Sequence, residues 1–206
     1  MVGAGSGSLP RIVAEAAAAA GRPLAGYLDF GATPEPPTTP LERLGDSGLL
    51  DDPAFLAGAD LVVAVQGPER QALALRLLGA SASLPPLVHP AATISTTATL
   101  GAGTVVSAGV IVQSDARIGR FCQLNTACTI DHDNVLGDFI SVAPGAHTAG
   151  HVTIEDAVFV GLGSVIINGV TVGARATIGA GAVVTRNVAP GGTVVGNPAR
   201  ALPPKT

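Results

Sequence analysis

Large apolar residues recur every six positions through the second half of the chain. Of sixteen positions spaced six residues apart, fifteen carry Ile, Leu or Val, and only Thr148 departs from this rule. No insertion or deletion interrupts the steps. An α-helix would repeat with a period of about 3.6 and a half-buried strand with a period of about two, so neither explains the pattern. The stepped positions are Ile94, Leu100, Val106, Val112, Ile118, Leu124, Ile130, Leu136, Val142, Thr148, Ile154, Val160, Ile166, Val172, Ile178 and Val184.

A small residue usually stands two positions before each large one, as at Ala98, Cys122, Cys128 and Ala176. Hexads with one large and one small inward residue are typical of a parallel β-helix, with three short strands in each coil of about 18 residues. The two cysteines occupy the small inward position. We therefore expect them to be buried packing residues and not parts of a disulfide framework.

The first half of the chain alternates between helix-like and strand-like segments. Helices are predicted over residues 9–21 and 68–79, and strands over 23–29, 59–67 and 84–90. This alternation favours a small parallel α/β sheet of the Rossmann-like kind. We predict two domains, an α/β domain over residues 1–88 and a β-helix over residues 89–206, with an exposed loop at "TPEPPTTP".

The glycine-rich segment "GAGSGSLP" precedes the first helix and could bring backbone N–H groups close to a phosphate. A phosphate-binding loop normally follows a full strand, and only Met1 and Val2 precede Gly3. We therefore expect either that the α/β domain lacks its first strand or that the true start lies upstream.

Charge and hydropathy exclude two classes of partner. The formal net charge is −4 with scattered signs, so no basic stripe is available for nucleic acid. The one signal-like segment, "RIVAEAAAAAGRPL", contains Glu15 and is far shorter than the ~20 residues of a membrane span. A cytoplasmic protein without a membrane partner is the expectation.

His132 stands between two aspartates, two positions after the inward Ile130, so it should point outward near a corner of a coil. Adding one coil of about 18 residues leads to Gly150, whose backbone N–H has no side chain to cover it. A base beside such a donor suits acyl transfer. Asp133, or alternatively Asp131, could hold the imidazole. The other interpretation is a solvated corner histidine.

Three histidines, His132, His147 and His151, raise the hypothesis of a zinc site shared between subunits. They stand at different phases of the hexad. We therefore expect no convergence within one chain and no metal.

Several motifs together resemble those of the PglD/NeuD-type sugar acyltransferases. They are "LVHPAATIS", "NTACTIDHDNVLGDFISVAPGA", "GLGSVIINGVTVGARATIGAGAVVTRNV" and "VVGNPAR". The resemblance implies a left-handed β-helix after the α/β domain, a homotrimer, and active sites between subunits. It also implies transfer of acetyl from acetyl-CoA to an amino or hydroxyl group of a sugar. The expected acceptor is a nucleotide-linked 4-amino-4,6-dideoxyhexose for polysaccharide biosynthesis.

The resemblance also implies residue roles. His132 would be the general base, Asp133 its orienting carboxylate, and Gly150 the N–H facing the thioester. Asn125 would line the sugar site, and the coenzyme arm would pass Leu162 and Ala180.

In the first domain, the nucleotide sugar would meet Gly5, Asp29 and Gly67. Departures occur here, because the family's "GGH" loop has no histidine counterpart and its "GDN" reads "QGPE". Ser141 also replaces a second histidine that many members carry.

Direct transfer is expected, since no Cys or Ser in the coils has a recognisable base beside it. A non-catalytic sugar-nucleotide-binding or scaffold protein is the alternative from another class. A metal-dependent hydratase is a third. Acetyl-CoA binding and elemental analysis for zinc would discriminate among the three.

Overall fold

A computed structural model describes residues 2–4, 9–29, 41–65 and 68–203 of the chain. The chain divides into two compact units, residues 1–90 and 91–206. The loop predicted at residues 33–40 lies outside the described residues, as do Gly5 and Gly67. None of the helices in the described part of the chain has the length and apolar content that a membrane span requires.

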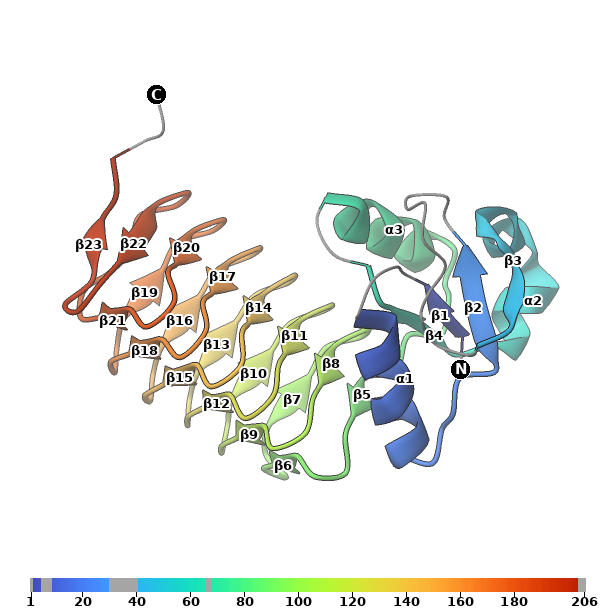
Figure 1. The fold of residues 1–206 in the computed structure, drawn as a ribbon, viewed down its shortest axis with the longest axis horizontal. Coiled ribbons are helices and arrows are strands. Elements are labelled where there is room, and N and C mark those ends of the chain that lie inside the picture. Colours follow the sequence, from blue (N-terminus) through green and yellow to red (C-terminus); the bar gives the residue numbers. More distant parts are fainter. Residues whose placement is uncertain (1, 5–8, 30–40, 66–67, 204–206) are drawn as a thin grey trace. The chain divides into compact units, whose positions relative to one another are not determined.

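The first unit contains a four-stranded parallel sheet in the order β3-β2-β1-β4 (Figure 1). Helices alternate with its strands, so the predicted parallel α/β sheet is confirmed. Helix α1 turns one stripe of small and medium apolar residues inward, among them the fully buried Val13 and Ala17. The elements are β1 (Val2–Ala4), α1 (Leu9–Ala19), β2 (Gly26–Asp29), β3 (Arg43–Asp46), the 3₁₀ helix η1 (Ser47–Asp51), α2 (Pro53–Gly58), β4 (Leu61–Val63), α3 (Pro68–Gly79) and β5 (Leu87–Val88).

Strand β1 contradicts one of the two alternatives stated for the glycine-rich segment, namely that the α/β domain lacks its first strand. Val2–Ala4 pairs in parallel with β2 on one side and with β4 on the other, so the unit does have a first strand, whose last two residues open the glycine-rich segment. Three residues suffice here because both edges of β1 are hydrogen-bonded to neighbours. The edge strand β3 was not predicted, since "RLGD" has neither alternation nor an apolar run.

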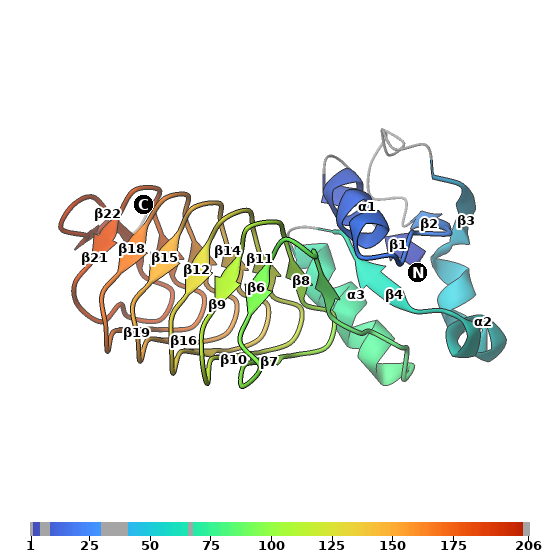
Figure 2. The ribbon, with the colours of Figure 1, turned by 90° about the horizontal axis from the view of Figure 1, so that it is seen from below.

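The second unit is a β-helix whose coils stack in chain order from β6 to β21 (Figures 1 and 2). From β6 to β21 the pairings between coils are parallel and join residues eighteen positions apart, as with Thr129 and Ile111. The last parallel pairing of the third face, between β20 and β22, joins residues sixteen positions apart. The first face holds β6 (Thr93–Ile94), β9 (Ile111–Val112), β12 (Thr129–Ile130), β15 (His147–Thr148), β18 (Val165–Ile166) and β21 (Val183–Val184). The second holds β7 (Thr99–Leu100), β10 (Arg117–Ile118), β13 (Val135–Leu136), β16 (Thr153–Ile154) and β19 (Thr171–Val172). The third holds β8 (Val105–Val106), β11 (Gln123–Leu124), β14 (Ser141–Val142), β17 (Phe159–Val160), β20 (Thr177–Ile178) and β22 (Thr193–Val195), and β23 (Arg200–Ala201) pairs antiparallel with β22.

The six-residue period therefore forms the core. Leu124, Ile130 and Ile166 have no exposed surface, as expected for the large inward positions. Cys122 and Cys128 are equally buried, which confirms their packing role, and burial raises the pKa of the Cys128 thiol to about 12.

Thr148, the one polar residue among the stepped positions, is also buried. Its hydroxyl accepts hydrogen bonds from the side-chain amide of Asn134 and, at 3.2 Å, from the backbone N–H of Asp131. It donates to the Thr129 carbonyl at 3.4 Å. The fully buried Asn134 in turn accepts from the Val152 N–H at 2.7 Å. This polar residue therefore fixes both ends of the segment 131–134 to the next coil.

Replacing this hydroxyl by a methyl group tests that role. We expect Thr148→Val to lower the free energy of unfolding by about 1–3 kcal/mol, because the buried Asn134 amide loses its acceptor. Thr153→Val, on an outward position of the next strand, should change it by no more than about 0.5 kcal/mol. Denaturant unfolding of both variants makes the comparison, and equal stabilities would contradict the assignment.

Candidate active site

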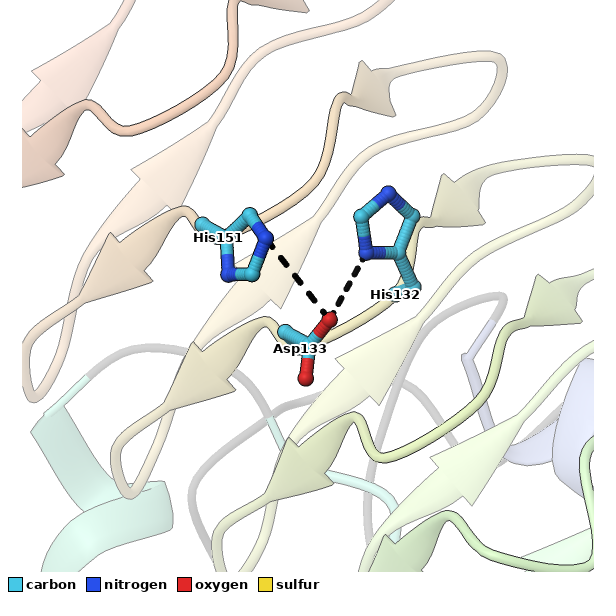
Figure 3. A group of neighbouring side chains, drawn as sticks. All are labelled: His132, Asp133 and His151. Atoms are coloured by element: carbon cyan, nitrogen blue, oxygen red, sulfur yellow. Dashed lines mark hydrogen bonds and ion pairs between the residues drawn. The ribbon is translucent and has the colours of Figure 1, made fainter.

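His132 and Asp133 form a hydrogen-bonded pair on the outside of the β-helix (Figure 3). Asp133 Oδ2 lies 2.8 Å from His132 Nδ1, and about half of each side chain is exposed. Asp131 has a different task, since its Oδ1 accepts the backbone N–H of His132 at 2.7 Å. Of the two carboxylates that the sequence left open, Asp133 is therefore the one that holds the imidazole.

The pairing determines where the proton of His132 lies. An ionised carboxylate can only accept hydrogen bonds, so Nδ1 carries the proton and Nε2 presents its lone pair. The hydrogen bond that His132 donates to Asp133 raises the pKa of His132, and the charge of Asp131 adds to this effect. The same hydrogen bond lowers the pKa of Asp133. The arrangement is that of a base strengthened and oriented by a carboxylate.

Gly150 lies directly against the imidazole, as the coil spacing predicts. A Cβ built on Gly150 would stand 2.4 Å from His132 Cε1 and 2.5 Å from Nε2, so any larger residue here would require the imidazole to move. Among the described residues, none accepts a hydrogen bond from the Gly150 N–H. The site thus pairs the free nitrogen of a base with an unpaired backbone donor.

His151 belongs to the same group of side chains, and this corrects the expectation that the histidines do not converge within one chain. Its ring meets that of His132 edge to face, with centroids 5.1 Å apart, and its Nε2 lies 3.8 Å from Asp133 Oδ2 (Figure 3). Asp133 and His151 occupy the same turn position in successive coils, both with φ of 57°. Comparing the positions of the histidines within the hexad did not predict this contact. The spacing of eighteen residues between Asp133 and His151, one full coil, would have predicted it.

The other predicted residues lie apart from this group. The Asn125 amide donates to the Val142 carbonyl at 2.7 Å, so it is held by the scaffold. Leu162 is exposed, and its carbonyl accepts from the Gly181 N–H at 2.8 Å, which joins the neighbouring turns that carry Leu162 and Ala180. His147 forms a 2.8 Å hydrogen bond between its Nδ1 and the Thr129 hydroxyl.

In the first unit, Asp29 ends strand β2 at the carboxyl edge of the sheet. Its carboxylate forms an ion pair with Arg43 on the neighbouring β3, at 3.3 Å. Carboxyl ends of parallel strands are where open α/β sheets bind ligands. Gly5 and Gly67, predicted near this edge, lie outside the described residues.

Comparisons with known proteins agree with this architecture. The family model for the hexapeptide repeat of succinyl-transferase matches residues 151–186. A GDP-perosamine N-acetyltransferase of Escherichia coli O157:H7 is 41% identical over 119 residues, which make up 55% of this chain and 54% of that relative. The match therefore spans about half the length of that curated relative.

Two solved structures are similar over nearly the whole chain. The acetyltransferase domain of PglB from Neisseria gonorrhoeae FA1090, in complex with acetyl coenzyme A, has a TM-score of 0.88 and 33% identity, covering 98% of each chain. PerB from Caulobacter crescentus, in complex with CoA and GDP-perosamine, has a TM-score of 0.86 and 31% identity, covering 98% of this chain and 97% of that one.

The stacked coils and these similarities define a hexapeptide-repeat protein with a left-handed β-helix. The chain belongs to the sugar acyltransferases of this class, which confirms the resemblance found in its motifs.

Asp133→Asn tests the electrostatic coupling of the pair. The amide has no charge, so the pKa of His132 should fall toward its ordinary value of about 6.5. The neutral imidazole then persists to lower pH than in the unchanged protein. NMR titration of the histidine Cε1 protons measures this. Asp131→Asn, which removes only a through-space charge, should give a smaller decrease, and an unchanged pKa in Asp133→Asn would contradict the coupling.

Proposed function

We propose that this protein transfers an acetyl group from acetyl-CoA to the amino group of a nucleotide-linked 4-amino sugar, with His132 as general base. One observation carries the proposal: His132 Nε2 has no hydrogen-bond partner among the described residues and lies against Gly150, while Asp133 holds Nδ1 at 2.8 Å. A base and an oxyanion donor are the two groups that acyl transfer needs side by side.

In the proposed reaction, the neutral sugar amine attacks the thioester carbonyl and Nε2 of His132 accepts the proton of the amine. The Gly150 N–H donates to the oxyanion of the tetrahedral intermediate. Collapse of that intermediate breaks the C–S bond, and the imidazolium returns the proton to the departing CoA thiolate. Asp133 stabilises the imidazolium while it exists.

The relatives support the choice of substrates. A PglB domain is solved with acetyl coenzyme A, and PerB is solved with CoA and GDP-perosamine. The donor would pass the exposed turns at Leu162 and Ala180, and Asn125 would line the sugar site. A GDP-linked 4-amino-4,6-dideoxyhexose is therefore the first acceptor to test, with Asp29 at the sheet edge, together with Gly5 and Gly67, assigned to the nucleotide.

Release of CoA thiol from acetyl-CoA measures the activity, with GDP-, dTDP- and UDP-linked 4-amino sugars as acceptors. We expect turnover with one of them and a ~10²- to 10⁴-fold lower kcat in His132→Ala, because the general base is removed. His147→Ala, which removes another exposed histidine, should retain the rate.

Equal losses in the two variants would contradict the assignment of His132. Acetyl-CoA binding is measured separately by calorimetry. A protein that binds neither acetyl-CoA nor any acceptor would favour the non-catalytic scaffold.

We also propose a homotrimer with the active sites between subunits. The coil over residues 159–167 supports association, since it exposes the large apolar side chains of Phe159, Leu162, Val165 and Ile167. Neighbouring exposed apolar residues of this size commonly mark protein interfaces.

Sedimentation equilibrium at micromolar concentration tests the assembly. We expect a trimer, because association would cover the exposed apolar side chains of residues 159–167. Its mass should be three times the chain mass of 20.2 kDa. A monomer mass over the whole concentration range would contradict both the homotrimer and an active site shared between subunits.

A further inference from the structure

We propose that His132, Asp133 and His151 together bind a zinc ion, and that zinc bound there blocks acetyl transfer by His132. The inhibitory part rests on the proposed function. The binding part rests only on the geometry of the three side chains, whose potential ligand atoms all lie within 4.8 Å of one another.

The ligand set suits zinc better than the hard divalent cations. Two imidazoles and one carboxylate are a combination found in zinc sites that keep a position open, whereas Mg²⁺ and Ca²⁺ prefer oxygen ligands alone. Zn–N and Zn–O bonds of about 2.0–2.2 Å in a tetrahedron place neighbouring ligands about 3.3 Å apart. The observed separations from Asp133 Oδ2, 2.8 Å to His132 Nδ1 and 3.8 Å to His151 Nε2, lie on either side of that value. The third separation, between the two histidine nitrogens, is at most 4.8 Å, so side-chain rotations would have to bring the three ligand atoms to tetrahedral spacing.

The backbone holds two of the three ligands in place before any ion arrives. Asp133 and His151 stand at equivalent turns, where the Asp133 N–H donates to the Ser114 carbonyl at 3.0 Å and the His151 N–H donates to the His132 carbonyl at 3.0 Å. Both residues adopt the left-handed conformation, which Asp and His accept more readily than most residues. Little conformational freedom of the main chain would be lost on binding.

Zinc would act on the tautomer of His132. In the hydrogen-bonded pair, Nδ1 carries the proton and Nε2 has the lone pair that the reaction needs. Zinc takes the lone pair of Nδ1, so the Nδ1 proton leaves to solvent and a proton is taken up at Nε2. The ring stays neutral, but Nε2 becomes a donor and can no longer accept a proton from the sugar amine. Zinc also occupies Asp133, which then cannot stabilise an imidazolium.

His151 is the residue with which to separate zinc binding from catalysis, since the proposed reaction does not use it. In His151→Asn the left-handed backbone is retained, because Asn also tolerates it. His147→Asn is the matched control, since His147 is an exposed histidine of the same coil whose Nδ1 pairs with Thr129 and is absent from the cluster.

Isothermal titration calorimetry with zinc chloride near neutral pH measures binding to the unliganded full chain. We expect one zinc per chain, affinity at least ~10-fold weaker in His151→Asn and in Asp133→Asn, and unchanged affinity in His147→Asn. The second ligand variant guards against a folding defect peculiar to residue 151. Affinity that is insensitive to both ligand variants, or lost equally in His147→Asn, would overturn the site.

Zinc inhibition of CoA release is measured in parallel, each variant being normalised to its own zinc-free rate. We expect half-inhibition near the calorimetric Kd, reversal by EDTA, and a shift in His151→Asn by the same factor as the Kd. Inhibition that survives the loss of binding would overturn the blocking mechanism. If no acceptor is turned over, the proposed function fails, and calorimetry still decides whether the zinc site exists.

Discussion

The hydrogen-bonded stacking of residues eighteen positions apart is the constraint on which the site depends. Because no residue is inserted between Ile94 and Val184, each side chain faces the corresponding side chain of the next coil. His132 therefore meets the bare backbone of Gly150, and Asp133 meets His151. Two residues from one coil and two from the next therefore form one chemical group.

Buried hydrogen bonds also join the coil that carries Gly150 and His151 to the coil that carries His132 and Asp133. Thr148 interrupts the apolar period, and Asn134 is buried without surface exposure, yet each satisfies the other and both hold main-chain groups. Burying such groups is unfavourable unless they are fully hydrogen-bonded. Their hydrogen bonds hold Asp131 and Asn134, the residues that flank His132 and Asp133, to the next coil.

Sequence reasoning recovered the features that follow from periodicity. The period of six predicted the coils, the buried cysteines and the contact between His132 and Gly150, because each is a consequence of counting. It did not find His151, since hexad phase describes strands and not the left-handed turns where Asp133 and His151 stand. The sequence shows Thr148 only as an exception to the apolar period, and its structural role became clear only from its hydrogen bonds. In the first unit, β1 and β3 are too short for any period to show, and their pairing is decided by neighbours distant in sequence.

The group of His132, Asp133, Gly150 and His151 lies within residues 131–151, and this has a consequence for how such proteins can vary in length. A whole coil added before or after this segment would repeat the same pairing and leave the chemical group intact, whereas a single extra residue inside it would move every later side chain to a new column. Evolution can therefore lengthen the flank along which an extended ligand lies in steps of one coil. The length of the β-helix and the chemistry of its surface can therefore change independently.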